Sequence, residues 1–215
     1  FMDYTFYVDE NVLIPRSDTE ILVETVNEVY DSICNIDDGK EDLPDSSHGR
    51  PRLLDLCCGS GCIGISLKLY HKEISLTLTD VSDRALIVTG KNLALHDIND
   101  AVVHMGDLFD GLDDIFDIIV CNPPYIERDI IKTLMPEVRE YEPVLALDGG
   151  VDGLDFYRKI IDKTGSHLNA NGYIFFEIGY DQGKAVSKLM VDAGFKDVIV
   201  RKDYAGMDRV LYGHL

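Results

Sequence analysis

Three observations predict an α/β protein built on one mostly parallel sheet. Short apolar runs alternate with segments of helical periodicity over most of the chain, the arrangement of parallel strands joined by crossover helices. The last two apolar runs follow each other without a helix between them, which predicts a closing antiparallel pair. The 215 residues, 46% of them hydrophobic, are enough for one sizeable core. We therefore expect a single domain with helices on both faces of a seven-stranded sheet.

The N-terminal part is expected to form a small hairpin and then a helix. Apolar and polar residues alternate over residues 4–14 around Asp9-Glu10-Asn11, a pattern of two short antiparallel strands. Residues 1–16 thus comprise the hairpin and the segment that leads into the helix. Apolar residues then recur at helical spacing from Leu22 to Ile33. Residues 37–51 are acidic and contain Gly, Pro and Ser, which predicts a solvated loop within the domain.

The rest of the chain supplies the sheet and its covering helices. Apolar runs predict strands at residues 52–56, 74–79, 101–103, 116–121, 172–178, 195–201 and 209–212. Helical periodicity predicts helices at residues 62–70, 82–95, 152–168 and 182–193. Residues 126–150 contain Pro136 and Gly149-Gly150 and are expected to be irregular. Because a loop of this length in a compact domain is usually functional, we expect it to serve the site.

Composition restricts the substrate and the compartment. The net charge of −19 disfavours a nucleic-acid substrate, since phosphate backbones attract Lys and Arg. No apolar run is long enough to span a membrane, and no signal segment opens the chain. The five cysteines lack disulfide-like spacing, and Cys57, Cys58 and Cys62 have no second ligand group to complete a metal site. We expect a monomeric cytoplasmic protein without metal, membrane or nucleic-acid partners.

The strongest functional signal is Asn122-Pro123-Pro124-Tyr125, directly after the predicted strand 116–121. Ligands collect at the carboxyl ends of parallel strands. The Asn122 side-chain oxygen and the rigidly held Pro123 carbonyl can each accept one N–H, and Tyr125 offers a flat face. We interpret the segment as a clamp for a planar group that carries an NH2. The alternative is a proline-rich turn with a packed tyrosine.

A glycine-containing turn upstream predicts a nucleotide-like ligand. The strand 52–56 leads through Asp55 into Cys57-Cys58-Gly59-Ser60-Gly61 and then into a helix, which brings backbone N–H groups to a ligand. Asp80 follows the second strand 19 residues after Gly61, close to the spacing of a carboxylate that binds ribose hydroxyls. The alternative for Asp80 is an N-cap of the helix near Ser82. Asp55 is expected to orient the loop or contact an amine.

Two further positions are weaker candidates. Asp107 and Leu108 follow the third strand, where a carboxylate can accept an adenine amino group and a leucine can cover the ring. A plain turn is the alternative at this position. Arg16 stands just ahead of the first long helix, where it either faces a ligand or lies exposed.

Together these residues resemble a class I, S-adenosylmethionine-dependent methyltransferase acting on an amino nitrogen. The segment from Ile14 to Glu20 is similar to the Pro-Arg-Pro-x-Thr-Glu segment of the HemK/PrmC family, the release factor glutamine N5-methyltransferases. Asn122-Pro123-Pro124-Tyr125-Ile126, Tyr141-Glu142-Pro143 and Phe176-Glu177-Ile178-Gly179 fit the same family. The resemblance covers nearly the whole chain. Cys57 stands where the family usually has glycine, and Ser17 where it usually has proline.

The resemblance implies a Rossmann-like fold, S-adenosylmethionine as methyl donor, and a glutamine of a peptide chain release factor as acceptor. The acceptor would be the side-chain amide in the Gly-Gly-Gln motif. Residues assigned to the cofactor are Asp55, Cys57, Cys58, Gly59, Ser60, Gly61, Asp80, Asp107, Leu108 and Asn122. Those assigned to catalysis are Asn122, Pro123 and Tyr125, with Pro124 and Arg16 added for substrate binding.

The resemblance also bears on domain organisation and on the alternatives. The family has an N-terminal helical domain that helps bind the protein substrate, and nothing in this sequence corresponds to it. We therefore expect residues 1–215 to form the catalytic domain alone. One alternative is adenine N6-methylation of DNA or RNA, with an extruded base at Tyr125. Another is a cofactor-binding subunit without activity, although that subunit would not need the clamp at Asn122.

Overall fold

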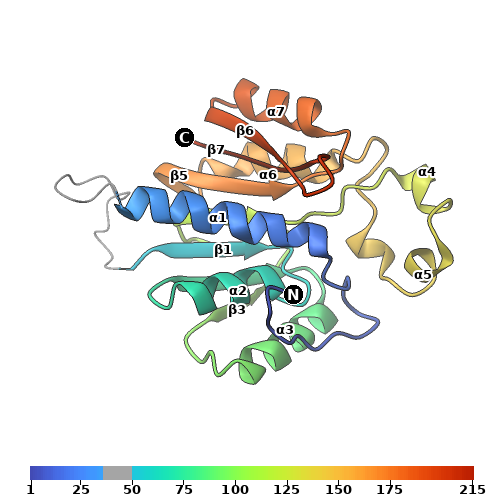
Figure 1. The fold of residues 1–215 in the computed structure, drawn as a ribbon, viewed down its shortest axis with the longest axis horizontal. Helices are drawn as coiled ribbons and strands as arrows, with labels where there is room; N and C mark the ends of the chain where they lie inside the picture. The colour runs from blue at the N-terminus through green and yellow to red at the C-terminus, as the bar shows by residue number, and fades with distance from the viewer. Residues whose placement is uncertain (36–49) are drawn as a thin grey trace.

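The computed structural model describes residues 1–35 and 50–215, so most of the predicted loop at 37–51 lies outside the described residues (Figure 1). Seven strands form one sheet in the order β3-β2-β1-β4-β5-β7-β6. Strands β1 to β5 run parallel, and β7 is antiparallel to both of its neighbours, β5 and β6. The predicted mostly parallel sheet is thus confirmed. The strands are β1 Arg52–Leu56, β2 Ser75–Asp80, β3 Val102–Met105, β4 Phe116–Cys121, β5 Leu168–Glu177, β6 Lys196–Lys202 and β7 Asp208–His214.

Helices cover both faces of this sheet, as predicted. Leu53 of β1 packs into one hydrophobic core with α1 and α2, whereas Leu54 and Leu56 pack into a second core with α6 and α7. Successive strand residues face opposite sides, so a parallel sheet buried on both faces needs an almost continuous apolar run. The helices are α1 Ser17–Asn35, α2 Cys62–Tyr70, α3 Asp83–Leu95, α4 Arg128–Ile131, α5 Pro136–Arg139, the 3-10 helix η1 Val144–Ala146, α6 Asp155–Thr164 and α7 Gly183–Asp192. No described helix combines the length and the apolar character that a membrane crossing requires.

The predicted hairpin at residues 4–14 is wrong, because this segment contains no strand. Its backbone binds a helix side chain instead: the Tyr7 amide donates to Asn92 Oδ1 (2.7 Å), and Asn92 Nδ2 donates to the Tyr7 carbonyl (3.0 Å). Val12 packs against Val88 of α3 in a small separate core. Val8 and Val12 thus pack toward α3, whereas Phe6 joins the core with α1 and α2. The alternation of apolar residues therefore reflects packing against helices and not the pairing of two strands.

Residues 126–149 form an arm that projects beyond the sheet, with α4 and α5 at its outer part (Figure 1). This stretch was expected to be irregular, and it contains three short helices. Ile126 pairs with Asp148 at the base of the arm, and the Gly149 amide donates to the Ile126 carbonyl (2.8 Å). Ile131 and Leu147, both within the arm, are buried. The arm is therefore a folded element with its own anchors.

The sheet order creates the place for a site. β1 lies between β2 and β4, so the chain leaves β1 toward one side and later returns on the other. Such a reversal opens a crevice at the carboxyl ends of the strands. The β1–α2 turn, Asp80 and Asn122 all lie at this edge.

Candidate active site

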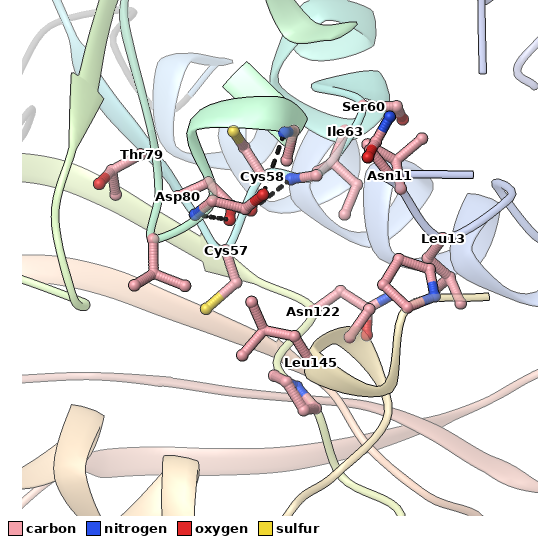
Figure 2. Close-up of a pocket in the computed structure, with 18 of the residues that line it drawn as sticks. Asn11, Leu13, Cys57, Cys58, Ser60, Ile63, Thr79, Asp80, Asn122 and Leu145 are labelled. Atoms are coloured by element: carbon pink, nitrogen blue, oxygen red, sulfur yellow. Dashed lines mark hydrogen bonds between the residues drawn. The ribbon is translucent and has the colours of Figure 1, made fainter. Parts of the chain in front are cut away.

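A cavity of about 980 Å³, part of it open to solvent, lies at the carboxyl ends of β1, β2 and β4 (Figure 2). Its walls include residues of the N-terminal segment 11–15, the β1–α2 turn, the ends of β2 and β3, and the arm. Nine of the predicted site residues line it: Cys57, Cys58, Gly59, Ser60, Asp80, Asp107, Leu108, Asn122 and Pro124. Figure 2 shows Thr79 and Asp80 at one end, and Leu13, Asn122 and Leu145 gathered at the other. We call these the Asp80 end and the Asn122 end.

The β1–α2 turn has a tightly wound backbone. Gly59 and Gly61 have φ values of 55° and 77°, in the left-handed region that favours glycine. Cys57 has a φ of 61° without being glycine, which is a strained conformation for a residue with a Cβ atom. The Cys58 amide donates to the Thr79 carbonyl (3.0 Å), which ties the turn to β2.

Asp80 connects this turn to the next helix. Its Oδ2 accepts from the Gly59 amide and its Oδ1 from the Ser82 amide, both at 2.9 Å (Figure 2). Burial raises the pKa of Asp80, although the hydrogen bonds from the two amides lower it. The alternative of an N-cap is not what the structure has, because Ser82 caps α3 with its own hydroxyl. Asp80 presents its carboxylate in the cavity wall.

Asp55 lies beneath the turn and does not line the cavity. Its Oδ2 accepts from the Gly64 amide in α2 (2.8 Å), and Oδ1 has no partner among residues 1–35 and 50–215. Burial raises the pKa of Asp55 to about 7. Of the two predicted roles, the geometry fits orienting the loop. Gly61 is also absent from the lining and packs against Ile65 and Thr89.

The cysteines around the turn are free thiols. Burial raises the pKa of the Cys58 thiol well above its ordinary value and that of the Cys62 thiol to about 12, so both pack as small apolar groups. In the described part of the chain, no group of three or more His, Cys, Asp or Glu residues has an arrangement that could hold a metal ion.

Asp107 and Leu108 reach the cavity from the turn after β3. Leu108 is buried and has a φ of 56°, while Asp107 is exposed. The Gly106 amide donates to the Asp80 carbonyl (3.1 Å), which joins this turn to β2. A carboxylate and an apolar side chain are thus adjacent at the Asp80 end, as expected from the sequence.

The Asn122 loop divides into two parts. Asn122 and Pro124 line the cavity (Figure 2). The Asn122 side chain has no hydrogen-bond partner among residues 1–35 and 50–215. Pro123 and Tyr125 do not line it. The Tyr125 hydroxyl donates to Glu177 Oε1 on β5 (3.1 Å), and its ring packs against the core, so it does not offer the open flat face that we expected.

Glu177 and Gln182 hold this loop from behind. Burial raises the pKa of Glu177, against hydrogen bonds from Thr19 and Tyr125 and the positive charge of Arg209, which lower it. Gln182 Nε2 donates to the Tyr125 carbonyl (2.9 Å). The position of Asn122 is therefore set by side chains from β5, α1 and the start of α7.

Arg16 is not a lining residue either. Its guanidinium donates to Glu142 on the arm, and only the neighbouring residues Pro15 and Pro143 line the cavity. These two prolines were not predicted as site residues, although both stand in the motifs that suggested the family. Other missed lining residues had no local signal, and they include Leu13, Leu145 and Phe156.

Comparisons with known proteins identify the family of this chain. The family model for the methyltransferase small domain matches residues 23–138. The release factor glutamine methyltransferase of Thermodesulfovibrio yellowstonii is 41% identical over 212 residues, which are 98% of this chain and 71% of that protein. This similarity covers the turn after β1, Asp80 and the Asn122 loop alike.

Solved structures show the same fold. The release-factor-specific protein-(glutamine-N5) methyltransferase of Alicyclobacillus acidocaldarius has a TM-score of 0.51 and 26% identity, covering 97% of this chain and 98% of that chain. The N-terminal domain of human METTL16 in complex with SAH has a TM-score of 0.61 and 18% identity, covering 98% and 75%. The second likeness concerns the fold alone. The chain has the class I methyltransferase fold and belongs to the release factor glutamine methyltransferase family.

Proposed function

We propose that this protein transfers a methyl group from S-adenosylmethionine to the side-chain amide of the glutamine in the Gly-Gly-Gln motif of a peptide chain release factor, in the cytoplasm. The observation that carries the proposal is the Asn122 side chain, which lines the cavity after β4 without a partner in the described chain. A primary amide there matches a substrate amide in its donors and acceptor. The family membership and the net charge of −19 favour a protein over a nucleic acid as acceptor.

The cavity residues suit S-adenosylmethionine. Asp80 offers a carboxylate to ribose hydroxyls, and Asp107 beside Leu108 suits the amino group and flat face of adenine. A Cβ atom on Gly59 would meet nothing within 4 Å, so a ligand can approach the backbone of residues 57–60 closely. When bound, the cofactor supplies an electrophilic methyl group on a sulfonium sulfur.

The chain's own contribution is to position the acceptor nitrogen. An amide nitrogen is a weak nucleophile because its lone pair is delocalised into the carbonyl group. The Asn122 oxygen in the cavity wall would accept one N–H, and the carbonyl of the next residue, Pro123, which is not itself a lining residue, would accept the other. Two acceptors favour the pyramidal nitrogen that forms during attack. The nitrogen would gain a bond to the methyl carbon while the carbon–sulfur electron pair would stay on sulfur, which would leave as a neutral thioether, and the nitrogen would then release one proton to water. Tyr125, held by Glu177, supports the loop that carries both acceptors.

The test is incubation with S-adenosylmethionine and a purified bacterial class 1 release factor, followed by tryptic mass spectrometry. Parallel reactions contain DNA or RNA in place of the release factor. The expected product is one added methyl group on the glutamine of the Gly-Gly-Gln peptide. Methylated adenine together with an unmodified Gly-Gly-Gln peptide would overturn the proposal.

A further inference from the structure

Arg16 and Glu142 form an ion pair between two segments that are far apart in the sequence. They are separated by 126 positions, and the Arg16 guanidinium donates to the Glu142 carboxylate. The Glu142 side chain is only 3% exposed, whereas that of Arg16 is 44% exposed. Glu142 Oε2 is buried without a partner among the described residues. Arg16 is therefore the cation on which this buried carboxylate depends.

The pair spans the Asn122 end of the cavity. Pro15 precedes Arg16 and Pro143 follows Glu142, and both prolines line the cavity. Leu13 and Leu145 lie further along the same two segments, and Figure 2 shows them on the side of Asn122 and away from Asp80. Two walls of this end, the N-terminal segment and the arm, are thus joined by the hydrogen bond between the side chains of Arg16 and Glu142.

The arm does not need this contact in order to fold. Its base is closed by the pairing of Ile126 with Asp148, and Arg128 donates to Asp148 at 2.9 Å. Leu147, within the arm, is buried. What the ion pair adds is a fixed spacing between the arm and the N-terminal segment. A spacing of that kind matters most to a ligand that lies between the two walls.

We propose that Arg16 and Glu142 are positioning residues for the acceptor amide. By holding the two proline-bearing walls at a set distance, they keep the carboxamide aligned with Asn122 without touching it. This inference rests on the proposed function, since it assigns the acceptor to that end of the cavity. It also gives Arg16 a role different from direct substrate contact.

The expected signature is a loss that falls on the acceptor and spares the cofactor. Arg16→Met and Glu142→Gln should each lower kcat/KM for the release factor about 10- to 100-fold, because misplacement of reacting groups is costly. The Kd for S-adenosylmethionine should stay within about twofold, since the Asp80 end is held by other contacts. Arg16→Lys keeps the charge and should restore part of the rate, but it loses the planar fork of donors.

A double variant separates positioning from stability. Only the Glu142 carboxylate of this ion pair is buried. Replacing both partners with apolar residues leaves no unpaired buried charge, so Arg16→Met/Glu142→Met should fold even where Glu142→Gln does not. Its kcat/KM should stay low, because two methionine side chains cannot replace the directional hydrogen bond between Arg16 and Glu142. The matched control is Glu28→Gln, which breaks the ion pair between Glu28 on α1 and Arg201 on β6. This variant should leave both the kcat/KM for the release factor and the Kd for S-adenosylmethionine unchanged.

Wild-type enzyme is assayed in parallel with the same release factor. Absence of wild-type methylation would refute the proposed function itself. Wild-type methylation together with wild-type kcat/KM in the folded double variant would overturn the positioning role. Loss of cofactor affinity equal to the loss of kcat/KM would also overturn it, because the pair would then act on the whole cavity.

Discussion

At the Asp80 end of the cavity a carboxylate binds backbone amides, whereas at the Asn122 end side chains from distant segments bind one another. Asp80 accepts from Gly59 and Ser82, which are 21 and 2 positions away. The Arg16–Glu142 and Tyr125–Glu177 contacts span 126 and 52 positions. The first arrangement follows from the strand–turn–helix geometry of the sheet. The second depends on individual side chains, so single substitutions should alter it without disturbing the first.

The largest effect expected at the Asp80 end is on cofactor binding. Asp80→Ala removes a carboxylate proposed to bind two ribose hydroxyls, worth roughly 1.5–3 kcal/mol, or about 10- to 100-fold in Kd. It also removes the acceptor of the Gly59 amide, so a lower thermal midpoint should accompany the loss. Titration calorimetry with S-adenosylmethionine measures the Kd. An unchanged Kd would remove Asp80 from the cofactor site.

The raised pKa of Asp55, which lies beneath the turn at this end, predicts how the free energy of unfolding depends on pH. Burial raises its pKa to about 7, from an ordinary value of about 3.9, so the folded state binds the proton more tightly than the unfolded state does. The contribution of Asp55 to stability is then greatest below about pH 4 and falls as the pH rises toward 7, above which it is lost. From pH 5 to pH 8 this group should cost on the order of 2 kcal/mol. Urea unfolding at each pH measures the change.

The matched variant for that prediction is Asp55→Asn, which cannot ionise and keeps an acceptor for the Gly64 amide. Its stability should vary less between pH 5 and pH 8 than that of the wild type. Carboxyls with a lowered pKa, such as Asp203 with its hydrogen bond from the Met207 amide, stay ionised in both proteins over this range. Equal pH dependence in the two proteins would contradict the assignment.

The smallest effect expected concerns backbone strain in the β1–α2 turn. Cys57 has a φ of 61°, so Cys57→Gly should stabilise the protein by about 0.5–1 kcal/mol. Cys58 is buried and is not in the left-handed region, so Cys58→Gly should instead destabilise it. Thermal unfolding of the two variants compares neighbouring positions directly. Destabilisation by both substitutions would mean that packing of the Cys57 side chain stabilises the protein by more than the strain at its φ of 61° destabilises it.

The two ends also differ in how far sequence alone could predict them. The turn after β1, Asp80 and Asp107 could be predicted from the sequence because each follows a predicted strand. The spacing of 19 residues between Gly61 and Asp80 is also visible in the sequence itself. Tyr125 was placed on the substrate side, but its hydroxyl binds Glu177, and only tertiary packing could show this. Leu145 was missed for the same reason, since the tertiary structure of the arm is what places this residue in the cavity wall.

The error over residues 4–14 has a related cause. Alternating apolar residues are consistent with a strand. Val12, however, is buried against α3, and the side chain of Asn92 forms hydrogen bonds with both the amide and the carbonyl of Tyr7. Periodicity reports which side chains are buried, and it does not report which element buries them. The strands β1 and β4 were predicted with their observed bounds, because a run buried on both faces leaves few alternatives.

We expect the two ends of the cavity to act separately, the Asp80 end on the cofactor and the Asn122 end on the acceptor. The most direct test measures cofactor Kd and single-turnover methyl transfer to a release factor in Asn122→Ala and Asp80→Ala. We predict that Asn122→Ala keeps the Kd within about threefold and transfers methyl at least about 100-fold more slowly, even at saturating cofactor. Asp80→Ala should recover most of its rate at saturating cofactor. Transfer at the wild-type rate by Asn122→Ala would show that the Asn122 side chain does not act on the acceptor amide.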